Sequence, residues 1–334
     1  MKRIIIFDMD GVLLAPRGYH LALQETVRLG AEALGYANIT LTYEQIAQFE
    51  GLGISSEWHS SAAALSMLTF GGTLSLGRLF GLLKREPAQI PARIRLERAI
   101  EAITGDATRI RESETLASPS YKIFQELILG SADFERIYRI KSSLNVASYL
   151  LQFDQPLLKT STRERLLAWL EHPEHGCAVM TNRPSSEMPD AGYGLRLVDL
   201  DVLPLVGNND MRWLAGQVGG ETAHFLKPNA AHALAALLAS TGRGLPESLL
   251  GAHGLLNGAD VDDLDVGEIV VFEDTPAGLI SVGATGDVLR AKGLPVAVKK
   301  IGIAPSGGVK AEFLRAQGAE VFDEINAALD TVLS

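Results

Sequence analysis

The pattern of apolar and polar positions divides the chain into three stretches. Residues 4–7 (Ile-Ile-Ile-Phe) are apolar without interruption, which predicts a short strand that is buried on both faces. From about residue 20 to residue 152, apolar positions recur every three or four residues, which predicts helices and no strand. After Pro156, short apolar runs alternate with helical stretches, as is typical of strands and helices in turn.

The middle stretch is predicted to be helical throughout. The sequence Thr-Tyr-Glu-Gln at 42–45 is a capping box, in which the threonine and glutamine side chains each accept the other residue's backbone N–H. Segments that contain glycine or proline separate the helices. The expected helices cover residues 20–35, a segment that opens at 42, and residues 57–68, 91–104, 119–129 and 133–151.

The last stretch predicts a parallel sheet, because strands that alternate with helices are joined in parallel. Ser161 and Glu164 stand in capping-box register at the start of its first helix. Residues 242–267 are rich in glycine and aspartate and lack periodicity, so we expect a loop there. The expected strands cover residues 177–182, 268–274 and 295–301, and the expected helices cover residues 161–172, 229–240 and a segment that begins at 275.

The predicted fold class is therefore α/β, with a Rossmann-like, doubly wound parallel sheet as its core. The first strand belongs to the sheet that the last stretch forms, so an enlarged all-helical cap is inserted after it. The core is expected to comprise residues 1–15 and 156–334. The cap is expected to comprise residues 16–155, about 140 residues.

Composition excludes several classes of partner. A net charge of −10 and a pI near 5.3 argue against binding to nucleic acid, whose phosphates repel an acidic surface. No apolar run approaches the roughly 18 residues that a membrane span requires. Cys177 is the one cysteine, so no intramolecular disulfide can form, which fits a reducing compartment. We therefore expect a cytoplasmic protein.

Unusual polar residues stand where three predicted strands end. Asp8 and Asp10 follow the first strand, Thr181-Asn182 end the second, and Glu273-Asp274 end the third. Lys227, before Pro228, directly precedes a helix. Because ligands of parallel sheets bind beyond the carboxyl ends of the strands, these side chains are expected to meet at one rim.

This set of side chains suits phosphoryl transfer. Four carboxylates at one rim repel one another unless a cation lies among them, and Mg²⁺ prefers oxygen ligands. One aspartate can then act as a nucleophile and its neighbour two residues on can hold or donate a proton. The lysine and the threonine hydroxyl would offset the charge of a phosphoryl group. The expected chemistry passes through an aspartyl-phosphate.

With these residues the chain resembles the haloacid dehalogenase superfamily, in its phosphatase and phosphomutase branch with a helical cap. The resemblance rests on "FDMDGVLL", "VMTNRP", "LKPNAAHAL" and "VVFEDTPAGL", which occur in the family's order. It implies an α/β core and a mobile cap. Dehalogenases of the family do not keep the second aspartate, which is present here as Asp10, so the resemblance favours phosphate chemistry.

The resemblance also implies a role for each matched residue. Asp8 would be the nucleophile and Asp10 the general acid and base, while Thr181 and Lys227 would bind the transferring phosphoryl group. The Mg²⁺ ligands would be Asp8, Asp10 through its backbone carbonyl, Glu273 and Asp274. The phosphate- and substrate-binding residues would be Gly11, Asn182, His20, Trp58 and His59.

Some features depart from the family pattern and leave the substrate open. The cap is longer than the family's usual helical cap, Leu14-Ala15-Pro16-Arg17 replace the common Asp-Ser, and residues 242–267 and 283–294 read as insertions. Residues 49–61 stand where relatives place a substrate-contacting loop. Trp58 there could equally be core of a helix, and His20 could equally be a surface residue.

The sequence thus predicts a Mg²⁺-dependent phosphatase that acts on a small phosphorylated metabolite. A mutase of the β-phosphoglucomutase type is the nearer alternative, but it needs a second cationic clamp, and residues 49–61 contain no Arg or Lys. A non-catalytic binding protein on the same fold is the more distant one. The large cap also offers a surface for a homodimer.

Overall fold

The structure is a computed structural model that describes residues 2–54, 56–87, 89–184, 189–261, 264–305 and 307–333. The chain divides into two compact units. One unit comprises Met1–Ala15 together with Pro156–Ser334, and the other comprises Pro16–Gln155. We call them the core unit and the cap unit and describe each by itself.

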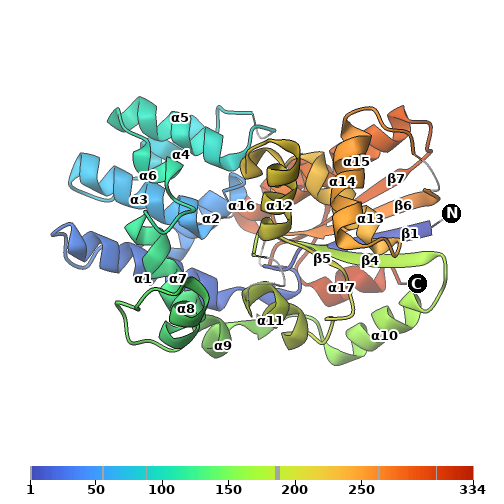
Figure 1. The fold of residues 1–334 in the computed structure, drawn as a ribbon, viewed down its shortest axis with the longest axis horizontal. Coiled ribbons are helices and arrows are strands. Elements are labelled where there is room, and N and C mark those ends of the chain that lie inside the picture. The colour runs from blue at the N-terminus through green and yellow to red at the C-terminus, as the bar shows by residue number, and fades with distance from the viewer. Residues whose placement is uncertain are drawn as a thin grey trace. The chain divides into compact units, whose positions relative to one another are not determined.

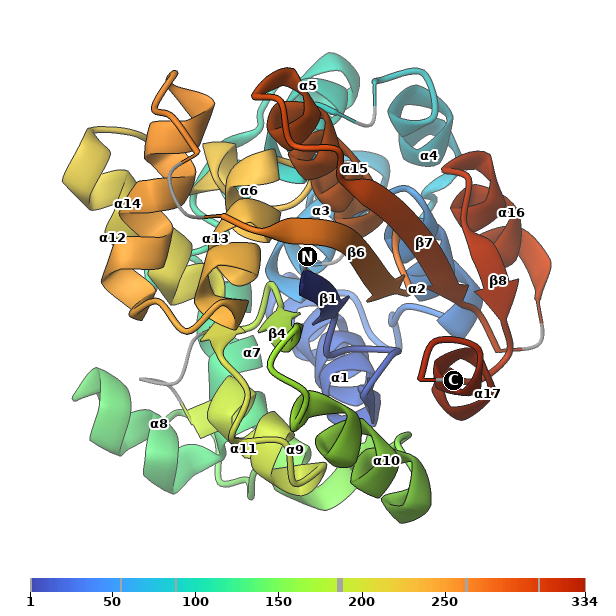
Figure 2. The same ribbon diagram turned by 90° about the vertical axis from the view of Figure 1, so that its right-hand side faces the viewer.

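The core unit is built on a six-stranded parallel sheet with the strand order β5-β4-β1-β6-β7-β8 (Figure 1, Figure 2). Ile5 of the central strand β1 lies opposite Cys177 of β4 and Val270 of β6. The strands are β1 (Lys2–Phe7), β4 (His175–Met180), β5 (Leu205–Val206), β6 (Val266–Glu273), β7 (Ala297–Ile303) and β8 (Glu320–Phe322). Two further strands of two residues each are β2 (Leu14–Ala15) and β3 (Gln155–Pro156).

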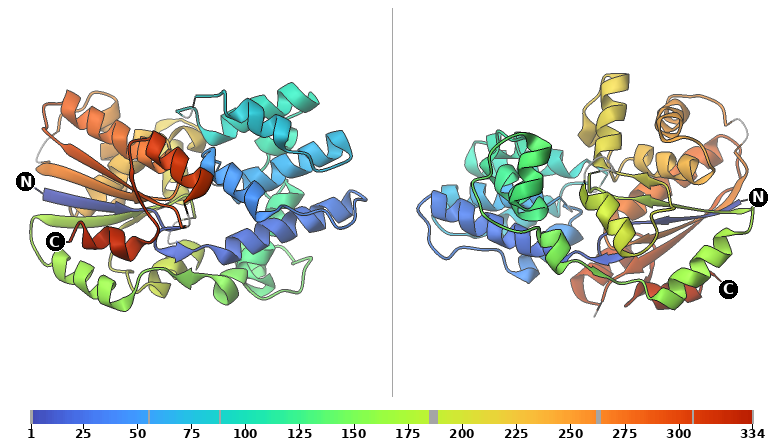
Figure 3. Two further views of the ribbon diagram at one scale, coloured as in Figure 1. Left: turned by 180° about the vertical axis from the view of Figure 1, so that it is seen from behind. Right: turned by 60° about the horizontal axis from the view of Figure 1, so that its bottom comes forward.

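The uninterrupted apolar run of β1 is explained by helices on both faces of the sheet. Ile4 and Ile6 pack into one hydrophobic cluster, with helices α12 to α16, and Ile5 and Phe7 pack into another, with helices α10, α11 and α17 (Figure 3). This arrangement confirms the predicted fold class. The helices are α10 (Thr160–Leu170), α11 (Pro189–Leu197), α12 (Asn208–Val218), α13 (Ala230–Ser240), α14 (Leu245–Leu256), α15 (Pro276–Ala291), α16 (Gly308–Ala316), α17 (Ile325–Asp330) and the 3₁₀ helix η1 (Thr222–His224).

The cap unit consists of helices, as the sequence predicts. None of the helices among the described residues of either unit is both long and apolar enough to cross a membrane. The helices of the cap unit are α1 (Arg17–Ala33), α2 (Tyr43–Gly51), α3 (Glu57–Gly71), α4 (Gly77–Leu83), α5 (Ala92–Thr104), α6 (Thr108–Arg111), α7 (Pro119–Leu129), α8 (Ser131–Tyr138) and α9 (Tyr149–Phe153).

Two local predictions for the cap unit have different outcomes. The capping box is confirmed, because Thr42 accepts the N–H of Gln45 and the Gln45 side chain accepts the N–H of Thr42. The single helix predicted over 133–151 is wrong. Arg139 adopts a left-handed conformation (φ 58°) that ends α8, and the chain turns into a loop before α9 begins.

Two predictions for the core unit are also wrong. Residues 242–267 contain α14, whose apolar face packs with α13 in one hydrophobic cluster. Most of residues 283–294 belong to α15, and their being an insertion stays a prediction. Helix α10 begins at Thr160 without the expected capping box, because its N-terminus is held from α17: the side-chain oxygen of Asn326 accepts the N–H of Lys159 at 2.8 Å.

Candidate functional site

The site lies at the carboxyl ends of three neighbouring strands, β4, β1 and β6. Because these strands are parallel and adjacent, the residues that follow Phe7, Met180 and Phe272 share one edge of the sheet. The N–H of Asp8 donates to the carbonyl of Phe272 at 2.9 Å, so the first aspartate is still held to the neighbouring strand. The polar residues that follow these strands, which are far apart in the sequence, therefore lie together in the structure.

A buried lysine bridges two of the carboxylates. The Lys227 Nζ lies 2.9 Å from Asp8 Oδ1 and 2.6 Å from Glu273 Oε1, and all three side chains are buried. Burial disfavours the ammonium, but the charges of Asp8 and Glu273 outweigh it and raise the pKa of Lys227 above its ordinary value. Lys227 is therefore a fixed positive charge beside Asp8.

The hydrogen bonds of Glu273 suit it to orienting Lys227. Its Oε2 accepts the N–H groups of Asp274 and Thr275 and the hydroxyl of Thr275, at 2.9 to 3.0 Å, while its Oε1 accepts from Lys227. The side chain fits because Gly278 has none: a Cβ there would lie 1.7 Å from Glu273 Oε1. The sequence "EDTPAG" thus fixes the Glu273 carboxylate, because Lys227 donates to one of its oxygens and Asp274 and Thr275 donate to the other.

A third carboxylate, Asp274, lies against the backbone of Gly11. A Cβ on Gly11 would lie 2.0 Å from Asp274 Oδ2, and Gly11 has φ +71°, a conformation that favours glycine. Asp8, Glu273 and Asp274 each offer an oxygen within 4.8 Å of the others. Lys310 Nζ also donates to Asp274 Oδ2 at 2.5 Å.

The second aspartate is held by an arginine that the sequence reasoning missed. The Nε of Arg183 donates to both oxygens of Asp10, at 3.1 and 2.9 Å, and its Nη2 donates to Oδ1 at 2.5 Å. The Arg183 side chain is 1% exposed and that of Asp10 is 28% exposed, so the arginine is fixed and the carboxylate partly accessible. Arg183 was overlooked because "TNRP" by itself is an ordinary strand exit.

The predicted phosphate-binding turn follows β4. Thr181 is fully buried, and its hydroxyl accepts the N–H of Arg183 at 3.2 Å. Its own N–H donates to the carbonyl of Val206 in β5 at 3.0 Å. Asn182 is next in the chain and is half-buried. The structure therefore brings Thr181, Asn182 and Arg183 to the same edge of the sheet as Asp8.

A buried histidine supports the lysine from behind. His232 Nδ1 accepts the N–H of Lys227 at 3.4 Å, and its Nε2 lies 3.1 Å from the carbonyl of Val206, which leaves Nε2 to donate. Burial first, and then the charge of Lys227, lowers the pKa of His232 to about 3 against the opposing hydrogen bond to Val206. His232 is thus a neutral side chain of α13 that hydrogen-bonds to β5 and to the backbone of Lys227.

Electrostatics at Asp8 are dominated by burial. Burial, and then the negative charges of Glu273, Asp274 and Asp10, raise the pKa of Asp8 well above its ordinary value, while Lys227 opposes them. Added positive charge close to Asp8 would favour its ionised form.

Repulsion among the four carboxylates is weaker than the sequence predicts. Lys227 pairs with Asp8 and Glu273, Arg183 pairs with Asp10, and Lys310 pairs with Asp274. Protein cations therefore already compensate much of the negative charge, and charge repulsion alone does not demand a metal. The donor set itself is what fits Mg²⁺: two carboxylates close together, in a space that Gly11 keeps free of a side chain.

The predicted cap residues have partners within the cap unit. His20 Nε2 lies 2.8 Å from Glu50 Oε1, and His59 Nε2 lies 3.1 Å from Glu114 Oε1. Trp58 is buried, with its ring edge-on to that of Tyr121 at 5.1 Å. Because these residues belong to the other unit, their role in substrate binding stays a prediction.

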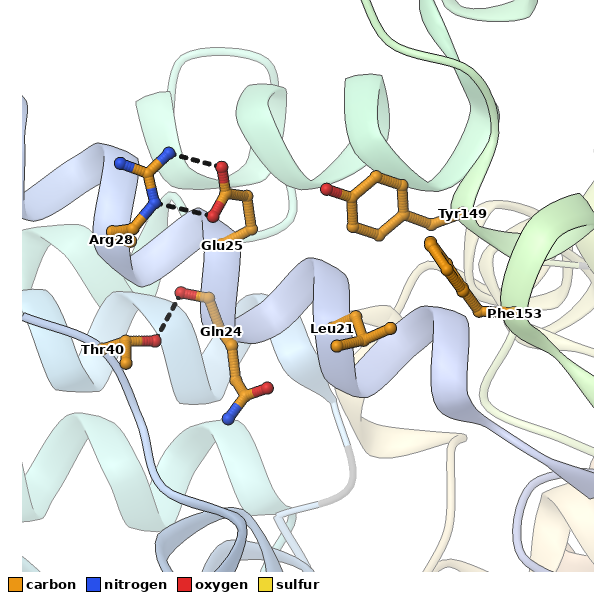
Figure 4. A pocket seen from close by; sticks show the side chains of 7 residues that line it. All are labelled: Leu21, Gln24, Glu25, Arg28, Thr40, Tyr149 and Phe153. Atoms are coloured by element: carbon orange, nitrogen blue, oxygen red, sulfur yellow. Dashed lines mark hydrogen bonds and ion pairs between the residues drawn. The ribbon is translucent and has the colours of Figure 1, made fainter.

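A separate cavity of about 330 Å³ lies within the cap unit, between α1 and α9 (Figure 4). Its charged groups, Arg28 and Glu25, are paired with each other at 2.5 Å, and Tyr149 and Phe153 line another part of it. The carboxylate cluster is not part of this cavity, so we place the chemistry at the sheet edge.

Comparisons with solved structures agree with this fold. No protein-family model matches the chain, and no curated protein matches it in sequence. The chain is similar to a Northeast Structural Genomics Consortium target (17% identity, TM-score 0.58), with 100% of this chain and 99% of that one covered. It is also similar to the phosphatase Tt82 from Thermococcus thioreducens (15% identity, TM-score 0.52), with 99% and 98% covered.

A third solved structure is less similar to this chain, and we draw no conclusion from it. A haloacid dehalogenase-like protein of unknown function from Agrobacterium tumefaciens matches at 14% identity and a TM-score of 0.39, over 98% of this chain and 96% of that one. The two stronger likenesses extend over nearly the whole of both chains. At 15 and 17% identity, these two likenesses show a shared fold.

Proposed function

We propose that the protein is a Mg²⁺-dependent phosphatase that hydrolyses a small phosphorylated metabolite. The observation that carries the proposal is the contact of Lys227 with Asp8, 2.9 Å apart, beside Asp274. A carboxylate so placed can attack a phosphoryl group whose charge the lysine offsets. The similarity to a phosphatase supports the same chemistry.

In the first step, a carboxylate oxygen of Asp8 forms a bond to phosphorus and the bond from phosphorus to the leaving oxygen breaks. This step requires Asp10 in its protonated form, which gives its proton to that oxygen, and the oxygen leaves as an alcohol. In the second step, Asp10 takes a proton from water as the water oxygen attacks the aspartyl-phosphate. Phosphate leaves, and Asp8 is regenerated as a carboxylate.

The other residues bind and orient the phosphoryl group. The Thr181 hydroxyl and the N–H of Asn182 would donate to its oxygens, and Lys227 would balance its charge. The N–H of Gly11, another predicted phosphate-binding residue, donates to the carbonyl of Leu14 at 2.7 Å.

Asp8, Asp274 and the backbone carbonyl of Asp10 would hold Mg²⁺. Glu273, the other predicted ligand, would orient Lys227 instead, because both its oxygens accept hydrogen bonds from the protein. When bound, Mg²⁺ supplies positive charge that favours the ionised nucleophile and stabilises the transferring group.

The direct test is hydrolysis of p-nitrophenyl phosphate with Mg²⁺ present and chelated, for the parent protein, Asp8→Asn and Asp10→Asn. We expect Mg²⁺-dependent release of phosphate, its loss in Asp8→Asn, and a phosphorylated protein that accumulates in Asp10→Asn because the second step lacks its base. Undiminished activity of Asp8→Asn would rule out the assigned nucleophile.

A screen of phosphorylated metabolites then separates the alternatives. Free phosphate as the product supports the phosphatase. An isomerised sugar phosphate that forms only with a bisphosphate activator would indicate a mutase. Halide release from a 2-haloacid would indicate a dehalogenase, and no turnover of any substrate with Mg²⁺ would favour a binding protein.

A further inference from the structure

The ammonium of Lys310 pairs with the carboxylate of Asp274, one of the proposed metal ligands. Lys310 lies in the first turn of α16, and its Nζ donates to Asp274 Oδ2 at 2.5 Å. Asp274 is 7% exposed and Lys310 is 20% exposed, so the pair is largely withdrawn from water. In such surroundings an ion pair is screened less than on the surface.

The backbone of Gly11 also lies close to this oxygen. The Gly11 backbone is so close that a Cβ there would lie 2.0 Å from Asp274 Oδ2. The carboxylate therefore has little freedom to move toward Gly11. A metal ligated by this oxygen at about 2.1 Å would lie within about 4.6 Å of the ammonium, by adding the two bond lengths.

Two positive charges at such a separation repel each other strongly. The Lys227 side chain cannot move away, because it is 2% exposed and bridges Asp8 and Glu273. Lys310 can yield, because its stem is flexible and its side chain borders solvent. Metal binding at Asp8 and Asp274 would thus expel the ammonium of Lys310.

We propose that Lys310 is a built-in counter-ion that competes with the divalent cation for Asp274 and so lowers the metal affinity of the site. The inference rests on the proposed function. Without metal, Lys310 offsets the charge of Asp274. The opposite role is a supporting contact that orients a metal-bound carboxylate, and loss of such a contact weakens metal binding, typically by 10- to 100-fold.

The test measures Mn²⁺ binding to the full chain by electron paramagnetic resonance of the free ion, and needs no substrate. Lys310→Met removes the charge and keeps the length of the side chain. Lys159→Met is the matched control, because it removes an exposed lysine that pairs with Glu324 in the same unit. Asp274→Asn identifies the binding that belongs to the site.

We expect Lys310→Met to bind Mn²⁺ about tenfold more tightly and Lys159→Met to bind it like the parent. We also expect Lys310→Met to melt at a lower temperature without metal and to gain more from added Mn²⁺. Equal or weaker binding by Lys310→Met would overturn the inference alone, provided that the parent shows binding that Asp274→Asn loses. Absence of such binding in parent and variant would overturn the inference together with the metal-dependent function.

Discussion

The guanidinium of Arg183 donates three hydrogen bonds to the carboxylate of Asp10, a residue 173 positions away in the sequence. A planar guanidinium fixes both the position and the plane of a carboxylate, which a lysine cannot do. Asp10 is the proposed acid and base, so its orientation decides whether it reaches the leaving oxygen. We therefore expect Arg183 to position Asp10 for the proposed proton transfer.

Replacing Arg183 by lysine should lower kcat for phosphate-ester hydrolysis by about 10- to 100-fold, because small misplacements of a catalytic group are costly. KM and Mn²⁺ affinity should change much less. Steady-state kinetics and Mn²⁺ titration test this. The matched control is Arg165→Lys, since Arg165 pairs with Asp330 on the surface of the same unit. A variant with kcat like the parent would show that Asp10 needs no such orientation.

Gly11→Ala should abolish metal binding and activity together. The new Cβ would overlap Asp274 Oδ2, and the positive φ of Gly11 adds strain. Gly242→Ala separates the two effects, because Gly242 also has a positive φ (+92°) but no heavy atom within 4 Å of an added Cβ. Mn²⁺ titration should show loss in the first variant and normal binding in the second. Normal binding by both would mean that Asp274 is not a ligand.

Protonation of His232 in the unfolded chain should make the core unit less stable in mild acid than at neutral pH. Its pKa is lowered to about 3 in the fold, whereas an unfolded chain has a histidine pKa of about 6.5. The unfolded state therefore binds a proton first as the pH falls, and stability decreases between these values by at most about 1.4 kcal/mol per pH unit.

Urea unfolding from pH 7 to pH 4 tests this prediction. His232→Gln should give a shallower dependence of the unfolding free energy on pH than the parent. His224→Gln, which replaces an exposed histidine of η1, should follow the parent curve. Parallel curves for parent and His232→Gln would contradict the assigned proton balance.

Glu126 of α7 should stabilise the cap unit at neutral pH. Burial opposes its ionisation, but hydrogen bonds from Leu144, Ser142 and Ser143 lower the pKa of Glu126 overall. The stabilisation is thus present above about pH 4.3, the unfolded value, and is lost as the pH falls through the folded pKa. Glu126→Gln should cost about 2 kcal/mol at pH 7, because its amide would face backbone N–H donors.

The measurement uses Trp58 fluorescence in a Trp169→Phe, Trp213→Phe background, since the chain has three tryptophans and Trp58 alone lies in the cap unit. The difference between parent and Glu126→Gln should shrink as the pH drops below 4. The exposed Glu101 supplies the control variant Glu101→Gln. A difference that stays constant with pH would show that ionised Glu126 is not the source.

The fold was predictable because its signals are local. The apolar run of β1 and the strand ends with their acidic residues could be found by position alone. Helix α14 could not, because glycines 251 and 254 weaken its local preference, and its stability comes from packing on α13. The break after Tyr138 was hidden for a similar reason: Glu126 fixes the loop at 142–144 from another helix.

The candidate site was predictable in part. Asp8, Lys227 and Asp274 follow from motifs in a fixed order. The pairs that Arg183 and Lys310 form with Asp10 and Asp274 join residues 173 and 36 positions apart, and no spacing rule links them. Long-range pairing of charges depends on the folded backbone, so these partners became visible only in the structure.

The central place of β1 in the sheet affects how the protein folds during its synthesis on the ribosome. Ile5 pairs with Cys177 and Val270, which are synthesised 172 (177 − 5) and 265 (270 − 5) residues later. At about 5 to 20 residues per second, the nascent first strand waits on the order of 10 to 50 seconds for its second neighbour. The helices of the cap unit are all made in this interval, whereas Asp8 reaches its final surroundings only after β6 has been made.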